Sequence, residues 1–129
     1  MAGKGKVLLV DDEDIILDVS REVFQFLGYD AAFAKEGTSA IEQYKREKEA
    51  GRPFDIVIID LTISEGMGGR ETIEKLKEYD PDVKAVVSSG YANDPVVQEY
   101  SRYGFSGKLT KPYRINEMKA MLEAMIKKN

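Results

Sequence analysis

The sequence contains no histidine and no cysteine among its 129 residues. Without cysteine the chain has no disulfide framework and no thiolate chemistry. Without histidine it has no serine–histidine triad, no histidine general base and no histidine–zinc site of its own. Any chemistry at a site in this chain must therefore use carboxylates, lysine, hydroxyls, backbone groups or a bound metal ion.

The chain also lacks long apolar runs and an excess of basic residues. No apolar run approaches membrane-spanning length, and the opening MAGKGK is too short and polar for a signal peptide, so we expect no membrane contact and a cytoplasmic location. The net charge of −4, from 19 basic and 23 acidic residues, argues against a nucleic-acid binder with a broad basic face. With 43% hydrophobic and 33% charged residues, the sequence predicts one soluble domain at residues 1–129, with its core at about 6–128.

Apolar runs alternate with helical patterns along the whole chain. Runs rich in branched apolar residues predict strands at 6–10, 29–34, 55–60, 83–88 and 105–110. Apolar spacing and capping signals predict helices at 15–27, at 39–50 with a capping box of Ser39 and Glu42, at 70–79, at 95–104 with Asp94 as N-cap, and at 115–126. This alternation is typical of a parallel sheet with helices on both faces, a doubly wound α/β fold.

Charged and hydroxyl residues stand at the ends of these predicted strands. In such folds ligands bind beyond the carboxyl ends of the strands. Asp11 and Asp12 follow the first strand, Asp60 ends the third, Ser88 and Ser89 end the fourth, and Lys111 follows the fifth. Since the strands are parallel, we expect these side chains to meet at one edge of the sheet.

The acidic residues at that edge pose an electrostatic problem. Carboxylates held within a few ångströms of one another raise each other's pKa. A divalent cation would remove this repulsion. Oxygen ligands with few protein contacts suit Mg²⁺, which keeps several waters and pairs with phosphate oxygens.

Each residue also has a purely structural interpretation. The acids at 11–14 can favour the N-terminus of the following helix through its dipole, and Asp60 can cap a loop. Ser89 can satisfy backbone groups, and Lys111 can be an ordinary surface lysine. We expect the other notable side chains to be structural: core or interface packing for Met118, Met121 and Met125, and half-buried surface positions for Tyr91, Tyr100 and Tyr103. The joint placement at successive strand ends is what favours a functional site.

Four segments, LLVDDED, DIVIIDLT, VVSSGYAND and GKLTKPY, resemble the receiver domain of two-component response regulators. The resemblance runs from about Lys6 to the final helix. It implies a flavodoxin-like (CheY-like) fold, with a five-stranded parallel sheet in the order 2-1-3-4-5 and five helices. The pattern DLTISEGMGG, SSGYAND and GFSGKLTKPY looks most like receivers attached to hybrid sensor histidine kinases.

The resemblance implies a phosphoacceptor and a metal site. Asp60 matches the aspartate whose carboxylate attacks a phosphohistidine of a histidine kinase or phosphotransfer protein. Asp11 and Asp12 match the acid pair that holds Mg²⁺, with Asp12 as the direct ligand. Asp60 and the backbone carbonyl of Thr62 would complete the protein ligands.

The resemblance also assigns the hydroxyl and the lysine. Ser89, rather than Ser88, matches the switch hydroxyl that turns toward the phosphoryl group, because SGY is the common family form. Lys111 matches the lysine that pairs with a phosphoryl oxygen, and its peptide bond to Pro112 is often cis in the family. Thr62 and Tyr91 match positions that tune the lifetime of the acyl phosphate.

A receiver domain is a signalling domain rather than an enzyme, although it assists its own phosphorylation and autodephosphorylation. Phosphorylation would switch the face formed by helix 4, strand 5 and helix 5. Only residues 113–129 follow Pro112, enough for one helix. We therefore expect an output through contact with a protein target, as a monomer or weak dimer, or a chain that is part of a hybrid kinase.

Two positions depart from the family pattern. Ser64 stands four residues after Asp60, where the family usually has proline, and the loop around it is about one residue longer than is common. Lys108 stands where many receivers have an aromatic residue in strand five that moves with the hydroxyl. Tyr91 or Tyr103 could take over that part.

Three other interpretations remain open. The chain could be a receiver-like protein-binding module that is never phosphorylated. It could resemble the haloacid-dehalogenase-like phosphohydrolases, which also use a strand-end aspartate with Mg²⁺, but these need a second acid where Thr62 stands. It could also be a structural α/β domain. A nucleotide-binding fold is disfavoured because no G-x-G-x-x-G follows the first strand.

Overall fold

The computed structural model of the chain describes residues 4–126, and it contains one five-stranded sheet in the order β2-β1-β3-β4-β5. All neighbouring strands pair in parallel, which confirms the predicted fold class and strand order. The last residues of the predicted core, 127 and 128, lie outside the described residues. In chain order the elements are β1 (Lys6–Val10), α1 (Asp14–Leu27), β2 (Asp30–Ala34), α2 (Gly37–Glu49), β3 (Ile56–Asp60), α3 (Gly69–Tyr79), β4 (Ala85–Ser89), α4 (Pro95–Gln98), the 3₁₀ helix η1 (Tyr100–Tyr103), β5 (Gly107–Thr110) and α5 (Ile115–Met125).

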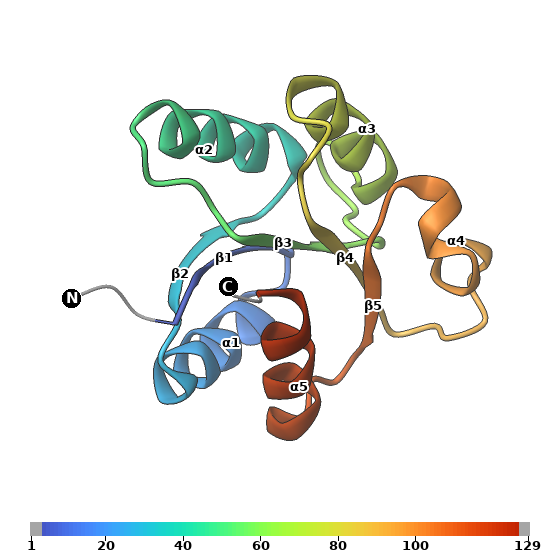
Figure 1. Cartoon of the computed structure of the whole chain (residues 1–129). Coiled ribbons are helices and arrows are strands. Elements are labelled where there is room, and N and C mark those ends of the chain that lie inside the picture. The colour runs from blue at the N-terminus through green and yellow to red at the C-terminus, as the bar shows by residue number, and fades with distance from the viewer. Residues whose placement is uncertain (1–3, 127–129) are drawn as a thin grey trace.

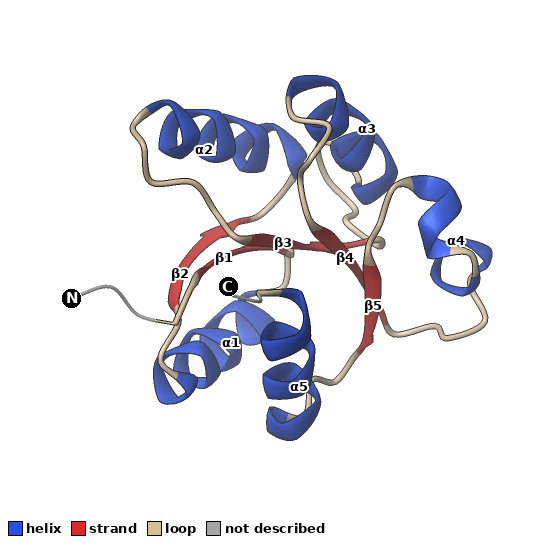
Figure 2. Ribbon diagram, viewed as in Figure 1, coloured by secondary structure: helices blue, strands red, loops and turns tan. Residues whose placement is uncertain are grey.

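Helices cover both faces of the sheet. Figure 1 shows α2, α3 and α4 on one side and α1 and α5 on the other, and Figure 2 shows the strands as a single twisted layer between them. Because side chains alternate along a strand, Leu8 and Val10 of β1 pack toward α2 and α3, whereas Val7 and Leu9 pack toward α1 and α5. This double burial is why the strands read as continuous apolar runs in the sequence.

The helices α1 and α5 are built as the apolar spacing predicts. Phe24 of α1 and Met118 and Leu122 of α5 are almost completely buried beneath the sheet. Each such side chain contributes about 1.5–3 kcal/mol through its burial. Met121 and Met125 pack against the same cluster, so the expected packing role of these methionines is confirmed.

The start of α2 differs from the prediction. The N-cap is Glu36, whose carboxylate accepts hydrogen bonds from the backbone N–H groups of Thr38 (2.8 Å) and Ser39 (3.1 Å), so the capping box based on Ser39 is wrong. The helix thus begins at Gly37, where the chain passes very close to α3. A Cβ atom at Gly37 would lie only 2.0 Å from Oγ1 of Thr72.

The helix predicted at 95–104 is interrupted. Its start is confirmed, because the side chain of Asp94 accepts a hydrogen bond from the N–H of Val96 at 2.8 Å. At Glu99 the backbone leaves helical angles, with φ −117° and ψ 45°, and continues as the 3₁₀ helix η1. Gly104 then ends the segment in a left-handed conformation, with φ 96°.

Across residues 4–126, no helix combines the length and the apolar character needed to cross a membrane.

Candidate functional site

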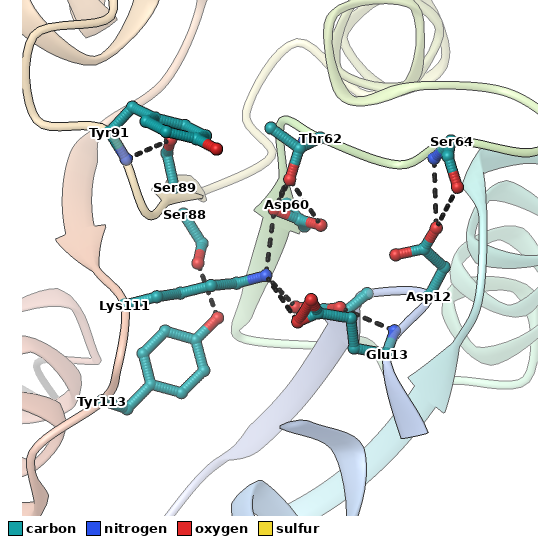
Figure 3. A network of polar contacts seen from close by, with 11 residues as sticks. Asp12, Glu13, Asp60, Thr62, Ser64, Ser88, Ser89, Tyr91, Lys111 and Tyr113 are labelled. Atoms are coloured by element: carbon teal, nitrogen blue, oxygen red, sulfur yellow. Dashed lines mark hydrogen bonds and ion pairs between the residues drawn. The ribbon is translucent and has the colours of Figure 1, made fainter. Parts of the chain in front are cut away.

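The strand-end residues do meet at the carboxyl edge of the sheet (Figure 3). Asp60 is the last residue of β3 and pairs in register with Ser88 of β4. Ser89, the last residue of β4, pairs with Thr110, which precedes Lys111. The backbone N–H of Lys111 donates to the carbonyl of Ser89 at 3.0 Å, which fixes the end of β5 against the end of β4.

Three carboxylates cluster at this edge. Asp11 and Asp60 are buried, with exposed fractions of 0% and 1%, and Asp12 is partly exposed. One oxygen from each of the three lies within 4.8 Å of the other two. Asp11 is held by its own turn, because its Oδ1 accepts the N–H of Glu13 at 2.9 Å as the chain enters α1. The predicted proximity of the acids is confirmed.

Lys111 lies between two of these acids and is not an ordinary surface lysine. Its Nζ is 2.7 Å from Oδ2 of Asp11 and 3.2 Å from Oδ1 of Asp60, and only 12% of its side chain is exposed. Burial acts to lower the pKa of Lys111, but the two carboxylates outweigh it and raise that pKa. The ammonium group therefore stays charged, as a partner for anionic oxygens must.

Lys111 compensates the charge of Asp11 only in part. Burial is the largest influence on Asp11 and raises its pKa, although Lys111 and the N–H of Glu13 oppose the rise. The buried Oδ2 of Asp11 has no hydrogen-bond donor of good geometry among residues 4–126, despite the nearby ammonium group. The cluster of three carboxylate oxygens has the donor chemistry that a small, hard dication prefers.

Two hydroxyl residues lie near the acid cluster, Thr62 in the turn after β3 and Ser89 at the end of β4. The Oγ1 of Thr62 donates to Oδ1 of Asp60 at 3.1 Å, and the backbone N–H of Thr62 lies 3.3 Å from the same oxygen. Ser89 is 2% exposed, and its Oγ accepts the N–H of Tyr91 at 3.0 Å. Ser89 therefore also satisfies a backbone group, as its structural interpretation expects.

Similarity to known proteins shows the family to which the chain belongs. The family model of the response regulator receiver domain matches residues 7–123. The chain is a receiver domain. It thus belongs to two-component signalling, as the four sequence segments implied, and receiver domains are signalling domains rather than classical enzymes.

The relatives of this receiver domain differ in length, and in some of them the matching region is a small part of a longer protein. The chain is 30% identical to the sensor kinase CckA of Brucella abortus over 99% of its own length, but the match spans only 13% of that kinase. It is 31% identical to the sporulation initiation phosphotransferase F of Bacillus subtilis over 88% of this chain and 87% of that protein. The receiver domain of a sensor histidine kinase from Pseudomonas aeruginosa, solved with a magnesium ion in its active-site cleft, has the same fold, with a TM-score of 0.83 at 18% identity over 95% of this chain and 97% of that one.

The structure places the two family departures of this receiver domain in different surroundings. Lys108 is exposed on β5, the edge strand of the sheet. Ser64 is tied directly into the acid cluster, because both its backbone N–H and its Oγ donate to Oδ2 of Asp12 at 3.0 Å. The N–H of Ser64 is the largest influence that lowers the pKa of Asp12, and burial opposes it.

The aromatic residues near the site are arranged differently from the expectation. Tyr91 is 69% exposed rather than half-buried, whereas Tyr100 and Tyr103 are partly buried against the core as expected. The peptide bond between Lys111 and Pro112 is cis, as the resemblance implied.

Sequence reasoning missed one polar pair. The hydroxyls of Ser88 and Tyr113 lie 2.6 Å apart (Figure 3). Burial raises the pKa of Tyr113, and the carboxylates of Asp11 and Asp60 add to the rise against the opposing bond to Ser88. Side-chain alternation along β4 is the signal that could have revealed the pair, because it turns Ser88 to the face opposite Ser89, toward α5.

Proposed function

We propose that this receiver domain is a phosphoacceptor, in which Asp60 receives a phosphoryl group from the phosphohistidine of a histidine kinase or phosphotransfer protein. One observation carries the proposal: the buried carboxylate of Asp60 lies at the acid cluster with the Lys111 ammonium 3.2 Å away. Phosphoryl transfer needs positioning and charge neutralisation more than covalent assistance, and these residues provide both.

The two oxygens of Asp60 are not equivalent. Oδ1 lies near both Lys111, at 3.2 Å, and the Oγ1 of Thr62, at 3.1 Å. Oδ2 has only the longer contact of 3.4 Å to Thr62, so it is the freer oxygen for attack. As the new O–P bond forms, the P–N bond of the donor breaks and the imidazole of the partner leaves. In this scheme Lys111 pairs with a phosphoryl oxygen and Ser89 turns toward the phosphoryl group.

The acid cluster fits Mg²⁺. Asp11, Asp12 and Asp60 would hold it, with the backbone carbonyl of Thr62 as a further ligand. When bound, the ion would supply positive charge that offsets both the carboxylates and the phosphoryl oxygens. The magnesium ion in the cleft of the Pseudomonas receiver domain supports this assignment.

We further propose how the phosphoryl group would be turned into a signal. Residues 1–129 would form a single receiver domain that catalyses its own dephosphorylation and switches the face of α4, β5 and α5. That face would contact a protein target or the rest of a hybrid kinase in the cytoplasm, as a monomer or weak dimer and without nucleic acid. The similarity to the sensor kinase CckA and to phosphotransferase F supports a kinase or phosphotransfer protein as partner.

Two aspartates that flank β3 provide a matched test. Asp60 ends the strand and Asp55 precedes it at the opposite edge of the sheet. We would treat the wild type, Asp60→Asn and Asp55→Asn with acetyl phosphate and measure intact mass, with Mg²⁺ or with EDTA. We expect the wild type and Asp55→Asn to gain one phosphoryl group only with Mg²⁺, and Asp60→Asn to gain none.

The opposite result would favour the binding module. If the wild type gained no phosphoryl group and also failed to bind the phosphoryl mimic beryllofluoride, the phosphoacceptor proposal would be wrong. A phosphohydrolase has less support, because Thr62 stands where that chemistry needs a second acid.

A further inference from the structure

The bonds of Ser64 depend on a residue that departs from the family pattern described above. Both of its donors, the backbone N–H and the Oγ, converge on Oδ2 of Asp12 at 3.0 Å. Proline, the usual family residue at this place, has neither a backbone N–H nor a hydroxyl. A receiver with proline there cannot make either bond.

The two bonds leave the other carboxylate oxygen of Asp12 free for a ligand. In Figure 3 the Oδ2 of Asp12 faces Ser64, and the second oxygen points toward Asp60. Asp12 is the partly exposed member of the acid cluster, so its side chain has more freedom to rotate than those of the two buried aspartates. Fixing Oδ2 restricts that rotation while the other oxygen stays directed at the cluster.

We propose that Ser64 is a positioning residue for metal binding, which orients Asp12 as a Mg²⁺ ligand and thereby couples the ion to the loop at residues 61–68. The inference rests on the proposed function, since it assumes that the acid cluster holds Mg²⁺. Ligating carboxylates are themselves oriented by hydrogen bonds, and removing such an outer partner typically weakens metal binding 10–100-fold.

The same loop has a second anchor beyond Ser64. The N–H of Met67 donates to Oε1 of Glu36 at 3.2 Å, and the carbonyl of Met67 accepts the N–H of Gly37 at 2.9 Å. Residues 64–67 are therefore pinned to Asp12 at one end and to the start of α2 at the other. By thermodynamic reciprocity, if the order of this segment favours metal binding, metal binding must favour its order.

The opposite effect, in which Ser64 competes with the ion for Asp12, is the main rival. Competition would require the donors to occupy the oxygen that faces the cluster. Both donors occupy the oxygen that faces away from Asp60 instead. Positioning is therefore the effect that this geometry supports.

Mg²⁺ affinity, measured by isothermal titration calorimetry, tests the inference directly. We expect Ser64→Ala, which keeps the N–H but loses the hydroxyl, to bind Mg²⁺ roughly 10-fold more weakly, and Ser64→Pro to bind it more weakly still. Ser64→Thr keeps both donors and should restore most of the affinity. Ser101→Ala, a change at an exposed serine of η1, is the matched control and should bind as the wild type does.

A second readout separates positioning from a general loss of structure. In the wild type, Mg²⁺ should slow the amide exchange of Met67, and in Ser64→Ala this slowing should be much smaller. Mg²⁺ affinity that is equal or tighter in Ser64→Ala would overturn the inference alone. Failure of the wild type to bind Mg²⁺ would overturn both the inference and the proposed function.

Discussion

Asp11 and Asp80 are both buried aspartates, yet they lie at opposite edges of the same sheet and in opposite electrostatic situations. Asp80, just before β4, is 9% exposed, and its oxygens are well supplied with partners. Tyr44 donates its hydroxyl to Oδ2 at 2.7 Å, and Lys48 lies 3.2 Å from the same oxygen. The bond from Tyr44 is the largest influence on Asp80 and lowers its pKa against the effect of burial.

Asp11, just after β1, is fully buried and less well compensated. Its pKa is raised, chiefly by burial, even though Lys111 is 2.7 Å away. The contrast teaches how to tell a structural acid from a functional one. A buried acid whose partners stabilise its charge strengthens the fold, whereas one whose charge is left costly creates a place for a cation.

The largest change in stability should come from removing the charge of Asp80. Asp80→Asn removes the charge that Tyr44 and Lys48 stabilise, so we expect the free energy of unfolding at neutral pH to fall by about 2 kcal/mol. Urea unfolding followed by circular dichroism measures this change. Mg²⁺ binding should be unaffected, because Asp80 lies at the far edge of the sheet, and weaker binding would show that the two edges are not independent.

Lowering the pH should remove the stability that the charge of Asp80 contributes. Because the pKa of folded Asp80 is below its ordinary 3.8, its charge stabilises the fold above that pH, and this stability is lost as the pH falls through the lower folded value. Asp12 and Glu36 also have lowered pKa values, so the informative quantity is the difference between wild type and Asp80→Asn. We expect that difference to shrink below about pH 4. A constant difference would contradict the assignment.

Removing the charge of Asp11 should change the stability in the opposite direction. Asp11→Asn removes a charge that burial disfavours, so we expect the metal-free protein to become more stable, while its Mg²⁺ affinity falls. The measurement is urea unfolding in EDTA, paired with calorimetric titration of Mg²⁺. A loss of stability in EDTA would mean that Asp11, like Asp80, is a structural acid.

The smallest effect should come from the hydroxyl pair of Ser88 and Tyr113. Ser88→Ala and Tyr113→Phe each leave one hydroxyl without its partner, so we expect each to lower stability by about 1 kcal/mol. The double variant should lose less than the sum, which gives a coupling energy of about 0.5–1 kcal/mol. Additive losses would show that the bond contributes nothing of its own.

Most of the fold could be predicted because strong local patterns agree with the tertiary structure. The apolar runs ending in Val10, Asp60 and Ser89 are buried on both faces, so their composition alone marks them as strands. The start of α2 could not be predicted, because its N-cap is Glu36, a residue type that is not a usual N-cap, whose carboxylate also accepts the N–H of Met67 from a distant loop. The break at Glu99 likewise has no local signal.

The candidate site likewise has one part that the sequence predicts and another that it does not. The meeting of Asp11, Asp60 and Lys111 follows from parallel strands ending at one edge, which spacing alone can predict. The bonds made by Ser64 and Tyr113 depend on how a loop folds back and on which face a side chain points to. Spacing marks Ser64 as unusual but does not reveal that its partner is Asp12.

The stabilising effect of Mg²⁺ tests the central claim, that the carboxyl edge holds uncompensated charge for a cation. We would compare urea unfolding of the wild type and Asp12→Asn, each with excess Mg²⁺ and with EDTA. We expect Mg²⁺ to stabilise the wild type by about 2.7 kcal/mol at a hundredfold excess over its dissociation constant, and Asp12→Asn far less. No stabilisation of the wild type, or equal stabilisation of both proteins, would contradict this claim.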